Sequence, residues 1–343
     1  MKLDVTLRIG DLAEVPSAAR VAEKLGFCGL WTSDTGHNPI LPLVLAAEHT
    51  ERIQLGTAIL VAFARSPMDV AYQAWDLARY SRGRFILGLG TQVPAHIRRR
   101  FSMEWKQPAA AALEDYVGAL RAIWNAWQSG NRLDYRGTYY THTLMSPFFN
   151  PGSHDYPHIP IYTAGVNQRM CRLAGAVSDG FHVHPFHSRE YLQQVVLPAI
   201  QEGAASTGRD PGSIEMVSGI FVAAGDQPSE IEAARQLIRQ QVAFYASTPD
   251  YAAVMDLHGW GEVRQELSRL ASQQNWAEMP SLITDEMLEA FAITCPWSEL
   301  AQHIHQKYDG ILDRVTLYLP FDPSRDGERW ASLCTALGAA DVH

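Results

Sequence analysis

Residues 159–167 read Ile159-Pro160-Ile161-Tyr162-Thr163-Ala164-Gly165-Val166-Asn167, a short apolar run followed by small residues and then by a helical pattern. This order predicts a β-strand that passes through a tight turn into an α-helix. The first N–H groups of a helix have no partner inside it and carry partial positive charge, so such a turn suits a phosphate. We therefore expect a phosphorylated cofactor to bind at Ala164, Gly165, Val166 and Asn167.

The same order of strand and helix recurs along almost the whole chain. Short β-type runs occur at residues 3–8, 29–32, 53–58, 85–88, 159–163, 180–184, 214–222 and 314–318. Helical patterns occur at residues 16–25, 42–50, 67–80, 108–128, 167–177, 188–207, 228–245 and 297–307. Alternation of this kind indicates an α/β fold with a parallel sheet, and eight units predict a (β/α)8 TIM barrel. The chemistry of such a barrel lies on the loops that follow its strands.

Two segments exceed a minimal barrel. Residues 133–140 alternate around Arg136-Gly137, which predicts a β-hairpin that continues into a loop rich in Pro and Gly at 146–160. We expect that loop to form a lid or rim. Residues 251–291 have a helical pattern between the seventh helix and the eighth strand, so they predict a helical insertion that covers the barrel mouth. Without a linker or an internal repeat, residues 1–343 are predicted to form a single domain.

Composition and charge restrict the class of protein. The 343 residues are 47% apolar, enough for a large core, and the formal net charge of -9 disfavours a nucleic-acid or anionic membrane surface. No apolar run reaches the roughly 18 residues that span a bilayer, and the N-terminus lacks a signal-peptide pattern. These features predict a cytoplasmic enzyme. The scattered cysteines are predicted to be ordinary buried thiols: Cys28, Cys171, Cys295 and Cys334.

The fourth predicted strand leads into Gly88-Leu89-Gly90-Thr91-Gln92-Val93. A dinucleotide-binding fingerprint would need a third glycine where Val93 stands, which argues against a Rossmann site. At the end of a barrel strand, the two glycines would instead let a flat ligand approach the backbone, with Thr91 and His96 facing it. The alternative is a tight turn that Thr91 caps.

Polar residues follow two other strands. Asp34 and His37 come after the second strand, where Asp34 can accept a hydrogen bond from a ligand and His37 can exchange a proton near neutral pH. Alternatively, Asp34 caps a turn. His182 and His184 alternate on the sixth strand, so both can face one cavity. No convincing third metal ligand accompanies them, which favours a substrate-facing or core pair over a metal site. Since there is no G-x-S-x-G motif either, the chemistry is expected to reside in a cofactor.

Taken together, these stretches resemble the luciferase-like monooxygenase superfamily, whose flavin- or deazaflavin-dependent TIM barrels include coenzyme F420-dependent oxidoreductases. The resemblance covers the whole chain. It is carried by Gly26-Phe27-Cys28-Gly29-Leu30-Trp31, Ala46-Ala47-Glu48-His49-Thr50-Glu51-Arg52-Ile53-Gln54-Leu55-Gly56-Thr57-Ala58, Gly83-Arg84-Phe85-Ile86-Leu87-Gly88-Leu89-Gly90 and Ala176-Val177-Ser178-Asp179-Gly180-Phe181. The segments Thr91-Gln92-Val93-Pro94-Ala95-His96-Ile97 and His142-Thr143-Leu144-Met145-Ser146-Pro147-Phe148-Phe149 further resemble the subgroup assigned to F420.

The resemblance implies how a cofactor would be held. It implies that Asp34 contacts the cofactor, that a non-prolyl cis peptide between Ala58 and Ile59 backs its ring, and that Thr91 and His96 contact its chain or phosphate. It assigns the phosphate itself to Ala164, Gly165, Val166 and Asn167.

At two positions, this sequence departs from its relatives. In several F420-dependent relatives a histidine directly follows the acid after strand two, but this chain has Thr35 there. A carboxylate that some relatives carry two residues after the strand-four threonine is replaced by Val93. The proton donor is therefore left open among His37, His184 and His142.

The implied activity is hydride transfer between F420 and a small organic substrate. The alternatives are an FMN-dependent monooxygenase and a flavin-binding barrel without catalysis. Members of the superfamily often form dimers, and the apolar helix at 67–80 is a candidate contact for a homodimer. No nucleic-acid partner, membrane partner or metal ion is expected.

Overall fold

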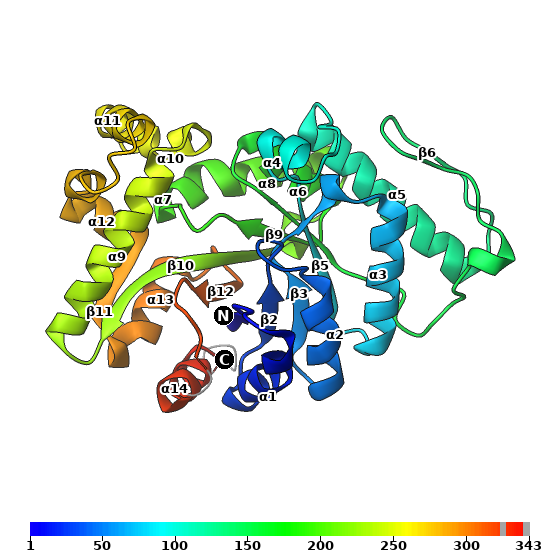
Figure 1. Cartoon of the computed structure of the whole chain (residues 1–343), viewed down its shortest axis with the longest axis horizontal. Coiled ribbons are helices and arrows are strands. Elements are labelled where there is room, and N and C mark those ends of the chain that lie inside the picture. The colour runs from blue at the N-terminus through cyan, green and yellow to red at the C-terminus, as the bar shows by residue number, and fades with distance from the viewer. Residues whose placement is uncertain (323–326, 339–343) are drawn as a thin grey trace.

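The computed structural model describes residues 1–322 and 327–338, so residues 323–326 and 339–343 of the predicted single domain lie outside the described residues. In the described part, eight parallel strands close into a barrel (Figure 1). Their order around the barrel is β1 (Lys2–Thr6), β2 (Gly29–Thr32), β3 (Gln54–Thr57), β5 (Phe85–Gly90), β8 (Ile161–Gly165), β9 (Gly180–Val183), β10 (Glu215–Gly225) and β12 (Arg314–Leu317). Pairing of β12 with β1 closes the ring, which confirms the (β/α)8 prediction.

Helices surround the barrel close to the predicted positions. They are α1 (Val15–Leu25), α2 (Ile40–His49), α3 (Pro67–Tyr80), α5 (Ala109–Ser129), α6 (Gln168–Val177), α8 (Leu197–Ser206), α9 (Pro228–Ala246) and α13 (Leu300–Tyr308). The predicted helix at 188–207 is divided, because α7 (Arg189–Tyr191) leads through a π-helical turn at Leu192–Val196 into α8. The structure adds α4 (Pro94–Arg99), α14 (Gly327–Gly338) and the short strand β4 (Leu60–Val61), which the patterns did not predict.

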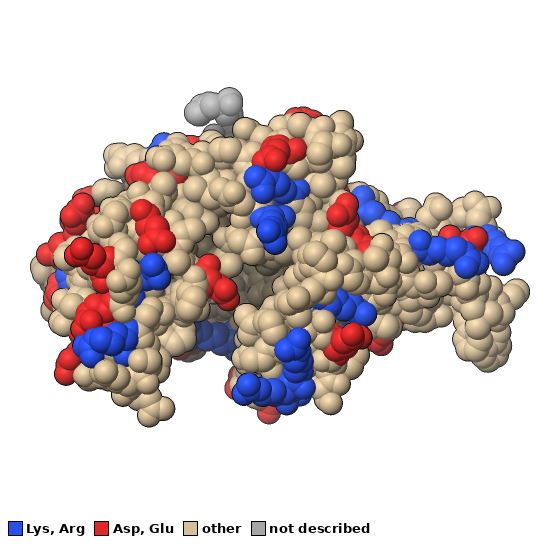
Figure 2. Space-filling model, turned by 90° about the horizontal axis from the view of Figure 1, so that it is seen from above, with Lys and Arg blue, Asp and Glu red and all other residues tan. Residues whose placement is uncertain are grey.

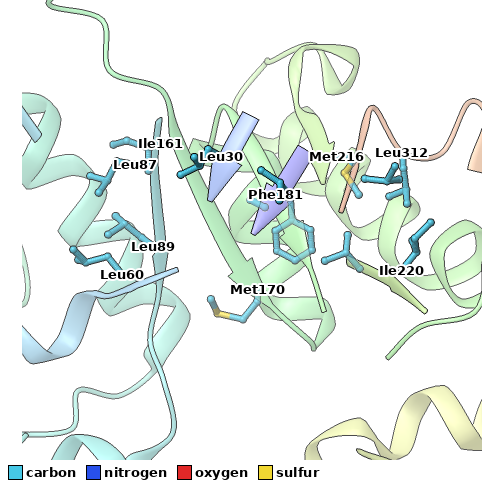
Figure 3. Close-up of a cluster of buried hydrophobic side chains, with 14 of the residues drawn as sticks. Leu30, Leu60, Leu87, Leu89, Ile161, Met170, Phe181, Met216, Ile220 and Leu312 are labelled. Carbon is cyan, nitrogen blue, oxygen red and sulfur yellow. The ribbon is translucent and has the colours of Figure 1, made fainter. Parts of the chain in front are cut away.

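Alternation along the strands builds two apolar layers. Leu30 and Leu87 point outward into the main core between strands and helices, and Figure 3 shows Leu87 beside its register partner Ile161. Their neighbours Trp31 and Ile86 point to the other side, where they form a smaller cluster with Tyr162 and Val217. Because side chains alternate along a strand, this second cluster fills the inside of the barrel.

A buried ion pair joins the first and last strands. Arg314 is fully buried, and its Nε and Nη2 donate to the two carboxylate oxygens of Asp4 at 2.7 and 2.8 Å. The indole Nε1 of Trp31 donates to the same carboxylate at 2.9 Å. Both charges of this buried pair therefore have hydrogen-bond partners, as a stable core requires.

The predicted hairpin is present, with β6 (Tyr135–Arg136) antiparallel to β7 (Thr141–His142). Asp115 of α5 anchors it by accepting from the Tyr135 hydroxyl and from the N–H groups of Tyr139 and Tyr140. In Figure 1 this hairpin extends sideways from the barrel rather than over its strand ends. The following loop packs on α3, where Trp75 Nε1 donates to the carbonyl of Gly152 at 3.1 Å.

The segment before the eighth barrel strand contains the predicted helices. They are α10 (Ala252–Leu257), α11 (Gly261–Ser272) and α12 (Asp285–Phe291), which gather beside α9 at the upper left of Figure 1. They lead into an unpredicted strand, β11 (Ala292–Pro296), that pairs in parallel with residues 221–225 of β10. With 11 residues, β10 extends past its barrel neighbours, and its free edge accommodates β11.

The apolar residues of α3 face inward. Val70, Ala74, Trp75 and Leu77 are buried, so packing within the chain explains the pattern at 67–80, and a homodimer stays a prediction. The most exposed large apolar side chains belong to the loop after the hairpin, with Phe148 at 88% and Leu144 at 82%. Among the helices of the described ranges, none has the length and apolar character to cross a membrane.

Candidate active site

A cavity of about 850 Å³ lies at the C-terminal ends of the barrel strands. The face of the molecule seen in Figure 2 is hollowed near its centre, with the hairpin region extending to one side. The volume is in the range of small-molecule sites. Another hollow, of about 710 Å³, lies outside the barrel between α5 and the hairpin, away from the strand ends that carry chemistry in this fold. The barrel mouth is therefore the candidate site.

One wall of the cavity is the loop after β3. Ala58 and Ile59 line it, and the peptide bond between them is cis, as the resemblance implies. The Ser33 hydroxyl donates to the carbonyl of Ala58 at 2.9 Å, and the N–H of Asp34 donates to the carbonyl of Ile59 at 3.1 Å. A Cβ on Gly90 would lie only 2.8 Å from Cδ1 of Ile59, so the glycine leaves room for this side chain. These contacts define a fixed apolar platform, formed by Ala58 and Ile59.

Asp34 holds this platform from behind. Its carboxylate is buried, accepts from the N–H of Val61 at 3.1 Å and from Nη1 of Arg65 at 2.6 Å, and does not line the cavity. The direct contact between Asp34 and a cofactor that the resemblance implies stays a prediction, while the described partners of its carboxylate are Val61 and Arg65. A carboxylate engaged by a guanidinium and a backbone N–H stabilises the loop that carries Ala58 and Ile59.

The turn at the end of β8 forms another part of the cavity wall. Ala164, Gly165 and Val166 line the cavity, whereas Asn167 is exposed and caps α6 by accepting from the N–H of Met170 at 3.0 Å. A Cβ on Gly165 would lie 2.3 Å from Cβ of Met170, so the turn needs glycine for close packing. The N–H groups at the first positions of α6 have no partner within the helix, and they remain suited to an anion.

Only some residues of the segment after β5 line the cavity. Thr91 and Gln92 line the cavity, and Gln92 adopts a left-handed backbone with φ of 62°. His96 lies exposed on α4 and is not among the residues that line the cavity. Arg100, just after α4, donates to the carbonyl of Thr35 and so links α4 to the loop after β2. The structure therefore places Thr91 in the cavity wall and His96 outside it.

The three candidate proton donors lie in different places. His37 lines the rim of the cavity and is exposed. His142 lies on β7 of the hairpin, and neither it nor any other residue of 133–160 lines the mouth cavity. The hairpin is anchored on α5 at the side of the barrel, so residues 146–160 and His142 lie away from the cavity lining. Their roles as a lid or rim and as a proton donor stay predictions. His184 does line the cavity.

The two strand-six histidines are held in neutral form. His182 packs edge-on against Trp31, with ring centroids 4.9 Å apart, and burial lowers its pKa to about 3. His184 stacks on Tyr251 at 4.4 Å, and burial, with a smaller contribution from His187, lowers its pKa to about 3 as well. Neither imidazole is charged near neutral pH, so neither is an imidazolium acid there. No group of three or more His, Cys, Asp or Glu side chains suited to a metal occurs within 1–322 and 327–338.

Sequence reasoning missed a tyrosine pair on the outer wall. Tyr251 lines the cavity and places its hydroxyl 3.0 Å from Nε2 of His184. Tyr318 also lines the cavity, and its hydroxyl lies 3.0 Å from that of Tyr245. Tyr318 is the last residue of the predicted eighth strand, and this position could have indicated that it lies at the barrel mouth. Tyr251 is the first residue of the insertion, and of residues 251–291 it alone lines the cavity, next to Asp250 before it.

Sequence comparison places these features among known proteins. The chain is 46% identical to an uncharacterized protein of Mycobacterium tuberculosis over 92% of both chains. It is 26% identical to the 5,10-methylenetetrahydromethanopterin reductase of Methanolobus tindarius over 90% of both chains. It is 31% identical to the F420-dependent glucose-6-phosphate dehydrogenase of Nocardia farcinica over 58% of both chains.

Structure comparison and a family model complete the assignment. The fold is similar to that of the coenzyme F420-dependent tetrahydromethanopterin reductase of Methanopyrus kandleri, with a TM-score of 0.79, 20% identity and 99% of both chains covered. It is also similar to the FMN-bound oxygenating constituent of 3,6-diketocamphane monooxygenase of Pseudomonas putida, with a TM-score of 0.68, 15% identity and coverage of 100% and 99%. Residues 4–314 match the family model of luciferase-like monooxygenases. The chain belongs to the luciferase-like monooxygenase family.

Proposed function

We propose that this protein is a coenzyme F420-dependent oxidoreductase that acts on a small organic substrate in the barrel mouth. The observation that carries the proposal is that the Ala58 and Ile59 platform and the turn at Ala164, Gly165 and Val166 line the wall of one cavity. The first is apolar and suits a flat ring; the second ends at a helix N-terminus and suits a phosphate. A deazaflavin or flavin carries both groups.

The residues present fit such a cofactor. The Ile59 side chain has room at the cavity wall because Gly90 has no side chain, and the α6 N-terminus offers N–H groups to a phosphate. Thr91, which carries a hydroxyl group, also lines the cavity. When bound, F420 would supply or accept a hydride at its ring. The chain's own contribution would be to fix the ring against Ile59 and to exclude water with the packed layer of Trp31 and His182 beneath it.

The relatives favour F420 over FMN as the cofactor. The Nocardia farcinica relative, at 31% identity over part of the chain, is named as F420-dependent. The FMN-bound neighbour is similar at the level of the fold. We therefore assign F420 first, with an FMN-dependent monooxygenase as the alternative.

Cofactor titration tests the proposal. Purified protein is titrated with F420 and, separately, with FMN while ligand fluorescence is followed. We expect saturable binding of F420 and much weaker binding of FMN. Tight FMN binding without a response to F420 would reject the proposal in favour of the alternative. If F420 binds but no compound from a panel of small alcohols, ketones and sugar phosphates changes its redox state, the non-catalytic alternative is preferred.

A further inference from the structure

The outer wall of the cavity carries a hydroxyl group whose hydrogen has no acceptor among the described residues. Tyr251 belongs to the turn Pro249–Tyr251 at the start of the insertion, and it reaches the cavity over the ring of His184. The only hydrogen-bond partner of its Oη within 1–322 and 327–338 is Nε2 of His184, at 3.0 Å. The direction of this bond decides what Tyr251 can offer to a ligand.

The backbone fixes that direction. The N–H of Phe186 donates to Nδ1 of His184 at 3.1 Å, so Nδ1 is an acceptor and carries no proton. A neutral imidazole has one N–H, which must then lie on Nε2. Burial keeps the ring neutral by lowering the pKa of His184 to about 3. Nε2–H therefore donates to Tyr251 Oη, and the hydrogen of the tyrosine hydroxyl is left for a molecule in the cavity.

We propose that Tyr251 binds the substrate by donating a hydrogen bond to a carbonyl oxygen, and that His184 is the positioning residue that orients its hydroxyl. This inference deepens the proposed function, on which it rests for the identification of the bound molecule as a substrate. It also supplies a polar contact that the sequence lacks at Thr35 and Val93, where relatives carry a histidine or a carboxylate. Here the donor reaches the cavity from the insertion instead.

The surroundings favour a neutral acceptor. Asp250 lines the same wall and interacts unfavourably with a Tyr251 phenolate, which together with the larger effect of burial raises the pKa of Tyr251 to about 12. Tyr251 is therefore a hydrogen-bond donor throughout the physiological range. A carboxylate beside the donor also disfavours an anionic ligand, whereas a ketone or aldehyde presents lone pairs without charge.

Binding of a ketone and its alkene isostere tests the contact without the cofactor. Cyclohexanone and methylenecyclohexane have similar shapes, but only the ketone accepts a strong hydrogen bond. We expect Tyr251→Phe to weaken cyclohexanone binding about 3- to 10-fold and to leave methylenecyclohexane unchanged. Tyr80→Phe, which removes an exposed hydroxyl on α3, is the matched control and should change neither. Equal losses for both ligands, or a loss in Tyr318→Phe but not in Tyr251→Phe, would overturn the assignment.

NMR of the unmodified side chains gives a second, independent measurement. In protein labelled with 15N-histidine, His184 should show a protonated Nε2 and an unprotonated Nδ1 from pH 5 to 9, with its signals assigned by their loss in His184→Asn. A protonated Nδ1 would reverse the bond to Tyr251 and reject the inference. The F420 titration distinguishes failure of this inference from failure of the proposed function. If the protein does not bind F420 but the ketone contact is found, only the cofactor assignment is rejected. If the protein binds F420 but the ketone contact is not found, only the role of Tyr251 is rejected.

Discussion

Oδ2 of Asp34 lies 2.6 Å from Nη1 of Arg65, and the same oxygen accepts the N–H of Val61 at 3.1 Å. The pair is nearly buried, with 5% of the Asp34 side chain and 15% of the Arg65 side chain exposed. It connects the loop after β2 with the loop that carries the cis peptide. The described contacts of this acid therefore stabilise the loop that carries Ala58 and Ile59.

Replacing Asp34 by Asn should destabilise the fold and weaken F420 binding together. The variant leaves the Arg65 guanidinium without its counter-charge, at a cost of about 1–3 kcal/mol in the free energy of unfolding by urea. Asp134→Asn is the control, because its ion pair with Arg136 is exposed and should contribute less than about 0.5 kcal/mol. An Asp34→Asn variant with normal stability and lost F420 binding would instead indicate direct contact with the cofactor.

Gln168→Pro should weaken F420 binding without disrupting α6. Gln168 is the first residue of α6, where proline is well tolerated, and Asn167 before it is extended with φ of -106° and ψ of 161°. The change removes one N–H from the turn, and loss of a hydrogen bond to a charged phosphate predicts roughly 10- to 100-fold lower affinity. Gln168→Ala keeps the N–H and should bind normally. Equal affinities in these two variants would remove the phosphate assignment.

Two glycines of β5 should respond differently to alanine. At Gly88 the new Cβ would lie 1.8 Å from the backbone oxygen of Thr57, so Gly88→Ala should destabilise the barrel by about 3 kcal/mol or more. At Gly90 it would meet only the flexible end of Ile59, 2.8 Å away. Gly90→Ala should therefore unfold near the wild-type temperature but bind F420 about 10-fold more weakly, because Ile59 must move. Normal affinity in this variant would show that Ile59 does not back the ring.

Stability should fall in mildly acidic solution because of the buried histidines. Burial lowers the pKa values of His182 and His184 to about 3 and that of His187 to about 4, all below the value of about 6.5 in an unfolded chain. Between these limits the unfolded state binds more protons, so the free energy of unfolding decreases as pH falls from about 6.5 toward 4. Each group contributes at most about 1.4 kcal/mol per pH unit.

Urea titrations at several pH values measure this effect. The slope of the free energy of unfolding against pH should correspond to uptake of more than two protons on unfolding near pH 5. The contribution of the carboxylates is subtracted, and it is measured in the same titrations below pH 4.5. His187→Asn should reduce the slope by about one proton. An unchanged slope in His187→Asn would contradict the buried neutral state.

The barrel was predictable because its signal is local and repeated. Runs such as 29–32 and 67–80 coincide with β2 and α3, since strand alternation and an N-terminal proline depend only on neighbouring residues. β11 was missed although Ile293 and Thr294 are β-branched, because its partner is the overhanging end of β10. Pairing over such a distance in sequence leaves no local pattern.

The site was predictable where it depends on strand ends and unpredictable where it depends on side-chain direction. The turn after β8 and the Ala58-Ile59 loop follow strands, so their place at the mouth follows from the fold. Asp34 turns toward Arg65, and His142 lies on a hairpin whose direction Asp115 sets. Tyr251 was missed because its position depends on how an inserted segment folds back over His184.

The pairing of β10 with β11 has a consequence for how this protein can diverge. The chain leaves β10 after Gly225 and returns at Ala292, which pairs with Phe221 of β10, so one pair of strands holds both ends of the intervening segment. A segment held in this way can be lengthened, shortened or exchanged without altering the order of the barrel strands. Tyr251 lies within this segment and lines the cavity, so under the function proposed above substrate choice can evolve there while the strands of the barrel stay in place.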